Sequence, residues 1–216
     1  MNMTKTNLRL WTLRVVLMFV GLSIAHLGVT LFLQSNLGSD PFNVLIQGLF
    51  RFIPWPAFMT HGYVHVTVCF LIIVALLIVD RSYVQIGTLL CMALGGPIID
   101  VFTLLLGGVI NSNSPMALRL ISLVLGCVIL AFGMTIVIKS QAGTGPNDLV
   151  AVVISDKCKW KFGIVRIVVD VCFAGIGFLL GGTLGLGTVV CAFLVGPTAQ
   201  KFLPISEKIC QKVLKQ

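Results

Sequence analysis

The stretch LGVTLFLQSNLGSDPFNV, residues 27–44, occurs in this chain a second time as FGMTIVIKSQAGTGPNDL, residues 132–149. At a constant offset of 105 positions, five residue types coincide: Gly28, Thr30, Ser35, Gly38 and Pro41 match Gly133, Thr135, Ser140, Gly143 and Pro146. Self-similarity at a fixed offset indicates a duplicated structural unit. The chain is therefore expected to contain two halves with the same local structure.

A second pair of matching segments supports the duplication. GTLLCMALGGP at residues 87–97 matches GTVVCAFLVGP at residues 187–197 with an offset of 100. Between the two blocks, Gly62 and Val64 pair with Gly163 and Val165 at an offset near 101. The order of the segments is the same in both halves, so the repeat extends over most of the chain.

The composition places both halves in a membrane. Of the 216 residues, 57% are apolar and 10% are charged, whereas a soluble domain carries about 25% charged residues. This leaves no room for a soluble catalytic domain or a nucleic-acid-binding domain. A membrane-crossing helix needs about 20 apolar residues, and six stretches qualify: 15–34, 62–79, 84–107, 117–138, 163–180 and 184–203.

The positive charges are distributed very unevenly across these six predicted spans. Six crossings bring 13 of the 15 Lys and Arg residues to one side, and only Arg51 and Arg119 to the other. Cytoplasmic loops are enriched in Lys and Arg. Both termini are therefore expected to be cytoplasmic, in the inner (plasma) membrane of a cell.

Each half is expected to hold three spans and one short helix, in an all-α membrane protein. The expected organisation is a cytoplasmic segment over 1–14, a first repeat over 15–107, a second over 117–204, and a basic cytoplasmic tail over 205–216. The short apolar segments 41–53 and 146–155 are too short to cross and are expected as broken or re-entrant helices. Because three crossings is an odd number, the two repeats are expected to be inverted, as in many secondary transporters.

The two Gly-Pro turns are candidate binding elements. Proline suits the first position of a helix, and Ser39, Asp40 or Thr144 could cap the helix that follows. A helix N-terminus within the membrane attracts anions or carbonyl oxygens. The candidate substrate-binding residues are Gly38, Ser39, Asp40, Asn43, Gln47, Gly143, Thr144, Asn147, Asp148 and Arg166. Alternatively, both short helices could lie flat at the interface.

Ionisable residues at membrane depth are the second group of candidates, because charges there usually face a cavity or a partner. Arg166 and Asp170 stand four residues apart on one helix face, either as part of a pathway or as a clamp of the bundle. Asp100 and Asp170 are candidates for coupling proton movement to solute movement. His26 lies deep in the first span, as a pathway residue or as a hydrogen-bonded packing residue.

No enzyme motif, metal site or cofactor site is expected. The seven cysteines contain no C-x-x-C pair and are interpreted as small packing residues. H-E-x-x-H, Walker and G-x-S-x-G motifs are also missing from the sequence. The chain is therefore expected not to be an enzyme.

The motifs together resemble the YczE/YyaS/YitT-type family of bacterial integral membrane proteins. The segments that carry the resemblance are 37–49, 86–106, 142–150 and 185–204, together with the Arg166/Asp170 pair. The resemblance covers nearly the whole chain beyond its first dozen residues. It implies a multi-pass inner-membrane protein for which transport has been suggested without a general substrate.

These observations predict a small transporter or permease for a small polar or anionic organic solute, surrounded by lipid and able to pair as a homodimer. No nucleic-acid partner is expected. Two alternatives remain open at this point. The chain could be a substrate-binding subunit that needs an energising partner, or a membrane accessory protein that regulates another protein.

Overall fold

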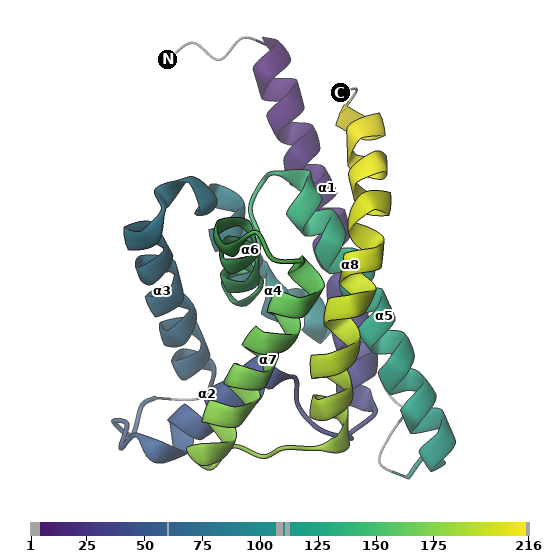
Figure 1. Ribbon diagram of the computed structural model, residues 1–216. Coiled ribbons are helices and arrows are strands. Elements are labelled where there is room, and N and C mark those ends of the chain that lie inside the picture. The colour runs from purple at the N-terminus through teal and green to yellow at the C-terminus, as the bar shows by residue number, and fades with distance from the viewer. Residues whose placement is uncertain (1–4, 60, 107–109, 111–112, 215–216) are drawn as a thin grey trace.

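A computed structural model describes residues 5–59, 61–106, 110 and 113–214, and these residues form an all-helical bundle (Figure 1). The α-helices are α1 (Lys5–Gln34), α2 (Pro41–Phe52), α3 (His61–Val79), α4 (Ile86–Leu106), α5 (Met116–Ser140), α6 (Pro146–Cys158), α7 (Phe162–Leu179) and α8 (Leu186–Leu214). A single 3-10 turn, η1 (Arg81–Tyr83), lies between α3 and α4.

Six of these helices are long and apolar enough to cross a membrane: α1, α3, α4, α5, α7 and α8. The six predicted spans are thereby confirmed as helices. Two helices extend beyond the predicted spans. The first span was predicted to start at residue 15, whereas α1 begins at Lys5, and the last was predicted to end at residue 203, whereas α8 continues through Pro204 to Leu214. Hydropathy marks where lipid contact ends, but a helix can continue into water when its residues, such as Glu207 and Lys208, favour helix.

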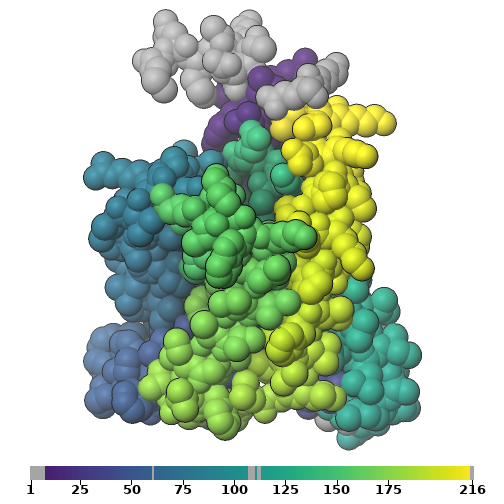
Figure 2. All heavy atoms as spheres, viewed as in Figure 1, coloured from purple at the N-terminus to yellow at the C-terminus, as the bar shows by residue number. Residues whose placement is uncertain are grey.

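The short helices α2 and α6 lie toward opposite ends of the bundle (Figure 1). Both termini are at one end, here called the termini end, and α6 is nearer to it, whereas α2 lies near the opposite end. Both helices start with proline at the first turn. In the space-filling view, α3 lies on one side of the bundle and α8 with α5 on the other, with α6 and α7 between them (Figure 2).

The most extensive contact between the two halves is the crossing of α1 and α5, which depends on glycine. A methyl group added at Gly28 would lie 2.3 Å from the backbone N of Leu130, and one at Gly133 would lie 2.2 Å from the backbone N of Ala25. Ala25 and Leu130 are themselves a pair at the offset of 105. The crossing therefore looks the same when the halves are exchanged, as a two-fold relation requires.

The loops before the short helices also make equivalent contacts in the two halves. Gly187 donates its backbone N–H to the carbonyl of Leu37 at 2.8 Å, and Gly87 donates to the carbonyl of Ala142 at 3.0 Å. In both loops the glycine has positive φ, 148° at Gly38 and 137° at Gly143, which only glycine adopts readily. Each half thus docks its turn on the last span of the other half.

The two halves differ where the short helices cross the neighbouring half. At the opposite end, α2 packs so closely on α7 that a methyl group at Gly48 would lie 2.3 Å from the carbonyl oxygen of Gly177. The equivalent residues of α6 and α3 are Val153 and Leu76, at offsets of 105 and 101, and both lie in an apolar cluster. Side chains therefore hold α6 and α3 further apart than α2 and α7.

Candidate functional site

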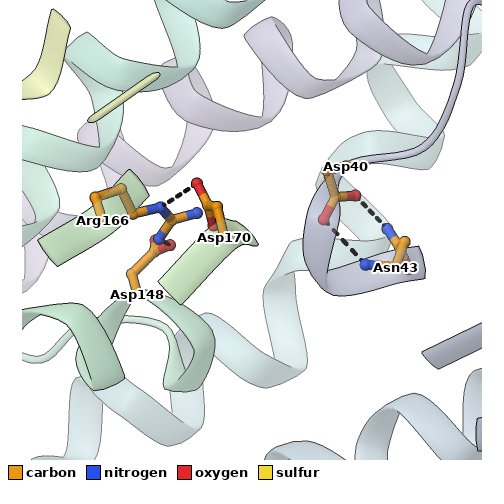
Figure 3. Close-up of polar contacts among 5 residues, drawn as sticks. All are labelled: Asp40, Asn43, Asp148, Arg166 and Asp170. Atoms are coloured by element: carbon orange, nitrogen blue, oxygen red, sulfur yellow. Dashed lines mark hydrogen bonds and ion pairs between the residues drawn. The ribbon is translucent and has the colours of Figure 1, made fainter. Parts of the chain in front are cut away.

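Arg166 is the centre of a buried ion-pair cluster in the second half (Figure 3). Its Nε donates to Oδ2 of Asp170 at 3.0 Å, one turn further along α7, and its Nη1 donates to Oδ1 of Asp148 on α6 at 2.5 Å. Arg166 is 7% exposed and Asp170 is 1% exposed. Charge-assisted bonds of this kind are the stronger class of hydrogen bond, and here they join α6 to α7.

The start of α6 places Asp148 in this cluster. Pro146 occupies the first turn of the helix, and Asp148 is its acidic first-turn residue. A carboxylate in the first turn interacts favourably with the helix dipole. No side chain caps α6, because its N-cap residue is Gly145. The expectation that Thr144 caps this helix was therefore wrong.

The other short helix is capped by a carboxylate. Asp40 is the N-cap of α2 and accepts a hydrogen bond from the backbone N–H of Asn43 at 3.1 Å. Of the two residues predicted for this cap, Ser39 and Asp40, it is therefore Asp40 that caps the helix. The Asn43 side chain donates to the other Asp40 oxygen at 2.5 Å. Figure 3 shows the Asp40–Asn43 cap and the Arg166 cluster as two separate groups, with no dashed line between them.

Ser39 and Gln47 link α2 to the loop that precedes α8. Gln47 donates its Nε2 to the Ser39 hydroxyl at 3.1 Å and accepts a hydrogen bond from the Thr183 hydroxyl at 2.7 Å. The hydroxyl of Thr188 donates to the Ser39 carbonyl at 2.5 Å. Both side chains, predicted for substrate binding, therefore already make bonds that fix the turn. The turn is also tightly packed, because a methyl group added at Gly38 would lie 3.0 Å from the Thr188 hydroxyl.

A cavity of 560 Å³ lies beside the other turn, next to α6, which is the short helix nearer the termini end (Figure 1). Its lining includes Gly143 and Thr144, both predicted as site residues, and Tyr83, Lys139 and Asp156. Asn147, the remaining predicted residue of this turn, is half-buried in the first turn of α6.

Asp80, next to η1, is a half-buried residue with a perturbed acidity. Hydrogen bonds from the hydroxyl and backbone N–H of Ser82, and the ammonium of Lys157, lower the pKa of Asp80 below its usual value. The ion pair with Lys157 measures 3.2 Å and joins the segment after α3 to α6.

His26 and Asp100, both proposed as pathway residues, lie outside the Arg166 contacts. The His26 ring Nδ1 is 2.7 Å from the carbonyl oxygen of Leu22, and its Nε2 faces Gly95 of α4. This is the geometry of the hydrogen-bonded packing alternative. Asp100 is exposed on α4 and has no ion pair among the described residues.

Six membrane-crossing helices, two short helices and a buried cluster of charges define a polytopic membrane protein. The chain belongs to the family described as "Family of unknown function (DUF6198)", which matches residues 12–204. No solved structure matches the chain.

Three relatives are similar over nearly their whole length. An uncharacterised protein of Haemophilus influenzae is 30% identical over 208 residues, covering 93% of this chain and 89% of that one. The uncharacterised protein YyaS of Bacillus subtilis is 27% identical, covering 88% and 92%. The uncharacterised membrane protein YczE of the same organism is 29% identical, covering 90% and 87%. The resemblance to a YczE/YyaS-type family is confirmed.

The bond between Asp148 and Arg166 was missed by the sequence reasoning, which paired Arg166 with Asp170 alone. The repeat contains a partial signal for it. At the offsets of the repeat, the three cluster residues correspond to uncharged or weakly basic ones: Asp148 to Asn43, Arg166 to His65 and Asp170 to Cys69. Charges that one half has acquired and the other lacks point to a specific role for that half.

Proposed function

We propose that this protein is a small secondary-type transporter that moves a small polar organic solute across the cell membrane, with both termini in the cytoplasm. The observation that supports this most is the exchange symmetry of two broken-helix units at opposite ends of the bundle. Such inverted repeats, with discontinuous helices near a central site, are typical of secondary transporters. The Arg166 cluster, which joins the short helix α6 to α7, is the candidate site.

The close packing of α2 on α7 and the wider spacing of α6 and α3 fit alternating access to that site. Inverted repeats allow a protein to exchange the conformations of its halves, so that first one end and then the other is closed. Here glycine lets α2 and α7 close tightly, whereas Leu76 and Val153 separate α3 and α6, near the 560 Å³ cavity. In the proposed cycle this arrangement is assigned to a state that is closed at the opposite end and would open toward the termini end.

Cysteine labelling tests the inverted arrangement. In a variant in which all seven cysteines are replaced by serine or alanine, Ser39→Cys or Thr144→Cys adds one thiol to one turn. A membrane-impermeant cationic thiol reagent is then applied to right-side-out and inside-out vesicles. We expect Ser39→Cys to react from the outside and Thr144→Cys from the inside. Reaction of both thiols from one side only would contradict the proposal.

Transport itself is tested with purified protein in liposomes. A solute that raises the unfolding temperature is loaded on one side, and exchange of labelled solute is measured with Asp170→Asn as a comparison. Exchange by the wild type alone supports a transporter. Binding without exchange would favour a substrate-binding subunit, and full activity of Asp170→Asn in cells would favour an accessory protein.

A further inference from the structure

The buried cluster contains more negative than positive charge. Two carboxylates are paired with one guanidinium, so the net charge is −1 (one positive minus two negative) when all three groups are ionised. The members are Asp148, Asp170 and Arg166, and the carboxylate of Asp40, outside the cluster, adds negative charge to the electrostatic environment of Asp170. Uncompensated charge is costly at membrane depth, so the arrangement calls for further positive charge.

Two of the carboxylates are supported by helix ends. Asp40 caps α2 and accepts two hydrogen bonds from Asn43. Asp148 lies in the first turn of α6 and is bonded to Arg166. Both positions benefit from the positive end of a helix dipole. Asp170, the remaining carboxylate, has no such support from a helix end.

Asp170 lies within α7, away from either helix end, and only one of its oxygens is satisfied. Oδ2 accepts from Arg166 at 3.0 Å, whereas Oδ1 is buried without a hydrogen-bond partner. The residue is 1% exposed. A buried carboxylate oxygen without a donor costs free energy, which a proton or a cationic N–H group would remove.

We propose that Oδ1 of Asp170 binds one mobile positive charge, either a proton or a small organic cation such as an ammonium or guanidinium compound, and that the two compete for it. This inference rests on the proposed transport function and gives its substrate class. When the cation binds, its N–H donates to Oδ1 and the Asp170 proton leaves to water, so one positive charge replaces another. Arg166 stays on Oδ2 throughout.

The same geometry disfavours the anionic solute expected from the helix dipoles. The first turn of α2 is already occupied by the carboxylate of Asp40, and that of α6 by Asp148. An anion entering this site would meet the carboxylates of Asp148 and Asp170. The groups that face Asp170 from the elements packed around it are Arg166 on α7, Asp148 on α6, Asp40 before α2 and the thiol of Cys191 on α8.

The test measures thermal unfolding of the purified full chain in detergent with small probes of different charge. The probes are ethylammonium, guanidinium, neutral propanamide and anionic propionate, at equal ionic strength and at acidic and alkaline pH. At about ten times its Kd, a ligand of the folded state raises the unfolding temperature of a chain of this size by about 3–6 °C. We expect such a rise with at least one cation, smaller at acidic pH, and none with propanamide or propionate.

Asp170→Asn removes the charge with little change of shape and should abolish this response. Glu207→Gln, the same change at an exposed carboxylate on α8, should retain it. If Asp170→Asn does not fold, proton release from the wild type on addition of the cation, followed with a pH dye in weak buffer, provides the same test. Failure of the transport proposal is detected separately, by the labelling of Ser39→Cys and Thr144→Cys.

Several results would overturn the inference. These are stabilisation by propionate, a cation effect that does not depend on pH, an unchanged response in Asp170→Asn, or no response to either cation.

Discussion

Arg166 holds two carboxylates that come from different helices, so removing its guanidinium leaves both without a counter-ion. Breaking a buried ion pair by deleting one partner costs about 3–5 kcal/mol. We therefore expect Arg166→Ala to lower the stability of the folded protein by about that amount. Thermal unfolding in detergent measures it.

Arg166→Lys is the matched control for this change. Lysine keeps the charge but cannot donate from a planar fork to Asp148 and Asp170 together, so an intermediate loss is expected. Equal stability of Arg166→Ala and the wild type would show that the cluster contributes nothing to the fold.

Asp80 provides a prediction about acidity outside the spans. Because the pKa of Asp80 is lowered in the folded state, its contacts stabilise the fold above the unfolded pKa of about 3.9, and that contribution is lost as pH falls through the lower, folded value. Lys157→Met should raise the pKa of Asp80 toward its usual value. Carbon-13 NMR of labelled aspartates, with Asp80→Asn for assignment, measures the shift, and an unchanged value would exclude a contribution of Lys157.

At the scale of the elements, the α1–α5 crossing reverses the usual effect of replacing glycine by alanine in a helix. Alanine favours helix over glycine by about 1 kcal/mol, but a methyl group at Gly28 would lie 2.3 Å from the Leu130 backbone. Overpacking of this kind costs about 1–3 kcal/mol. We expect Gly28→Ala to lower the unfolding temperature.

Gly175→Ala on α7 is the control for the crossing, because nothing lies within 4 Å of the position that its methyl group would occupy. This variant should be neutral or slightly more stable than the wild type. If both variants raised the unfolding temperature, the close approach of α1 and α5 would be refuted.

The elements themselves were largely predictable, whereas the caps and contacts between them were only partly so. Hydropathy identified all six spans, and proline marked the start of both short helices. Thr144 was wrong as a cap because the residue just before the proline takes that position, which is Asp40 in one half and Gly145 in the other. The Asp148–Arg166 bond spans 18 residues and two helices, and no local pattern fixes such a contact.

At the scale of the whole molecule, a substitution at Gly177 can make the close crossing of α2 and α7 resemble the wider crossing of α6 and α3. Gly177→Leu introduces the residue type found at the equivalent Leu76, and its side chain would push α2 away from α7. We expect a single cysteine at Asn43 in the cysteine-free variant to react faster with an impermeant thiol reagent from outside. Gly175→Leu, with open space at that position, should leave the rate unchanged. The same rate in both would show that this crossing does not close the site.

The glycine crossing of α1 and α5 also has a consequence for how such a chain could have arisen. The surface that Gly28 and Gly133 form is complementary to an oppositely oriented copy of itself, rather than to anything within its own half. A single three-span ancestor could bury that surface only by inserting into the membrane in both directions and pairing head to tail. Gene fusion would then have joined the two copies of a dual-topology dimer in one chain. After fusion, one copy could diverge and acquire the charges of Asp148, Arg166 and Asp170.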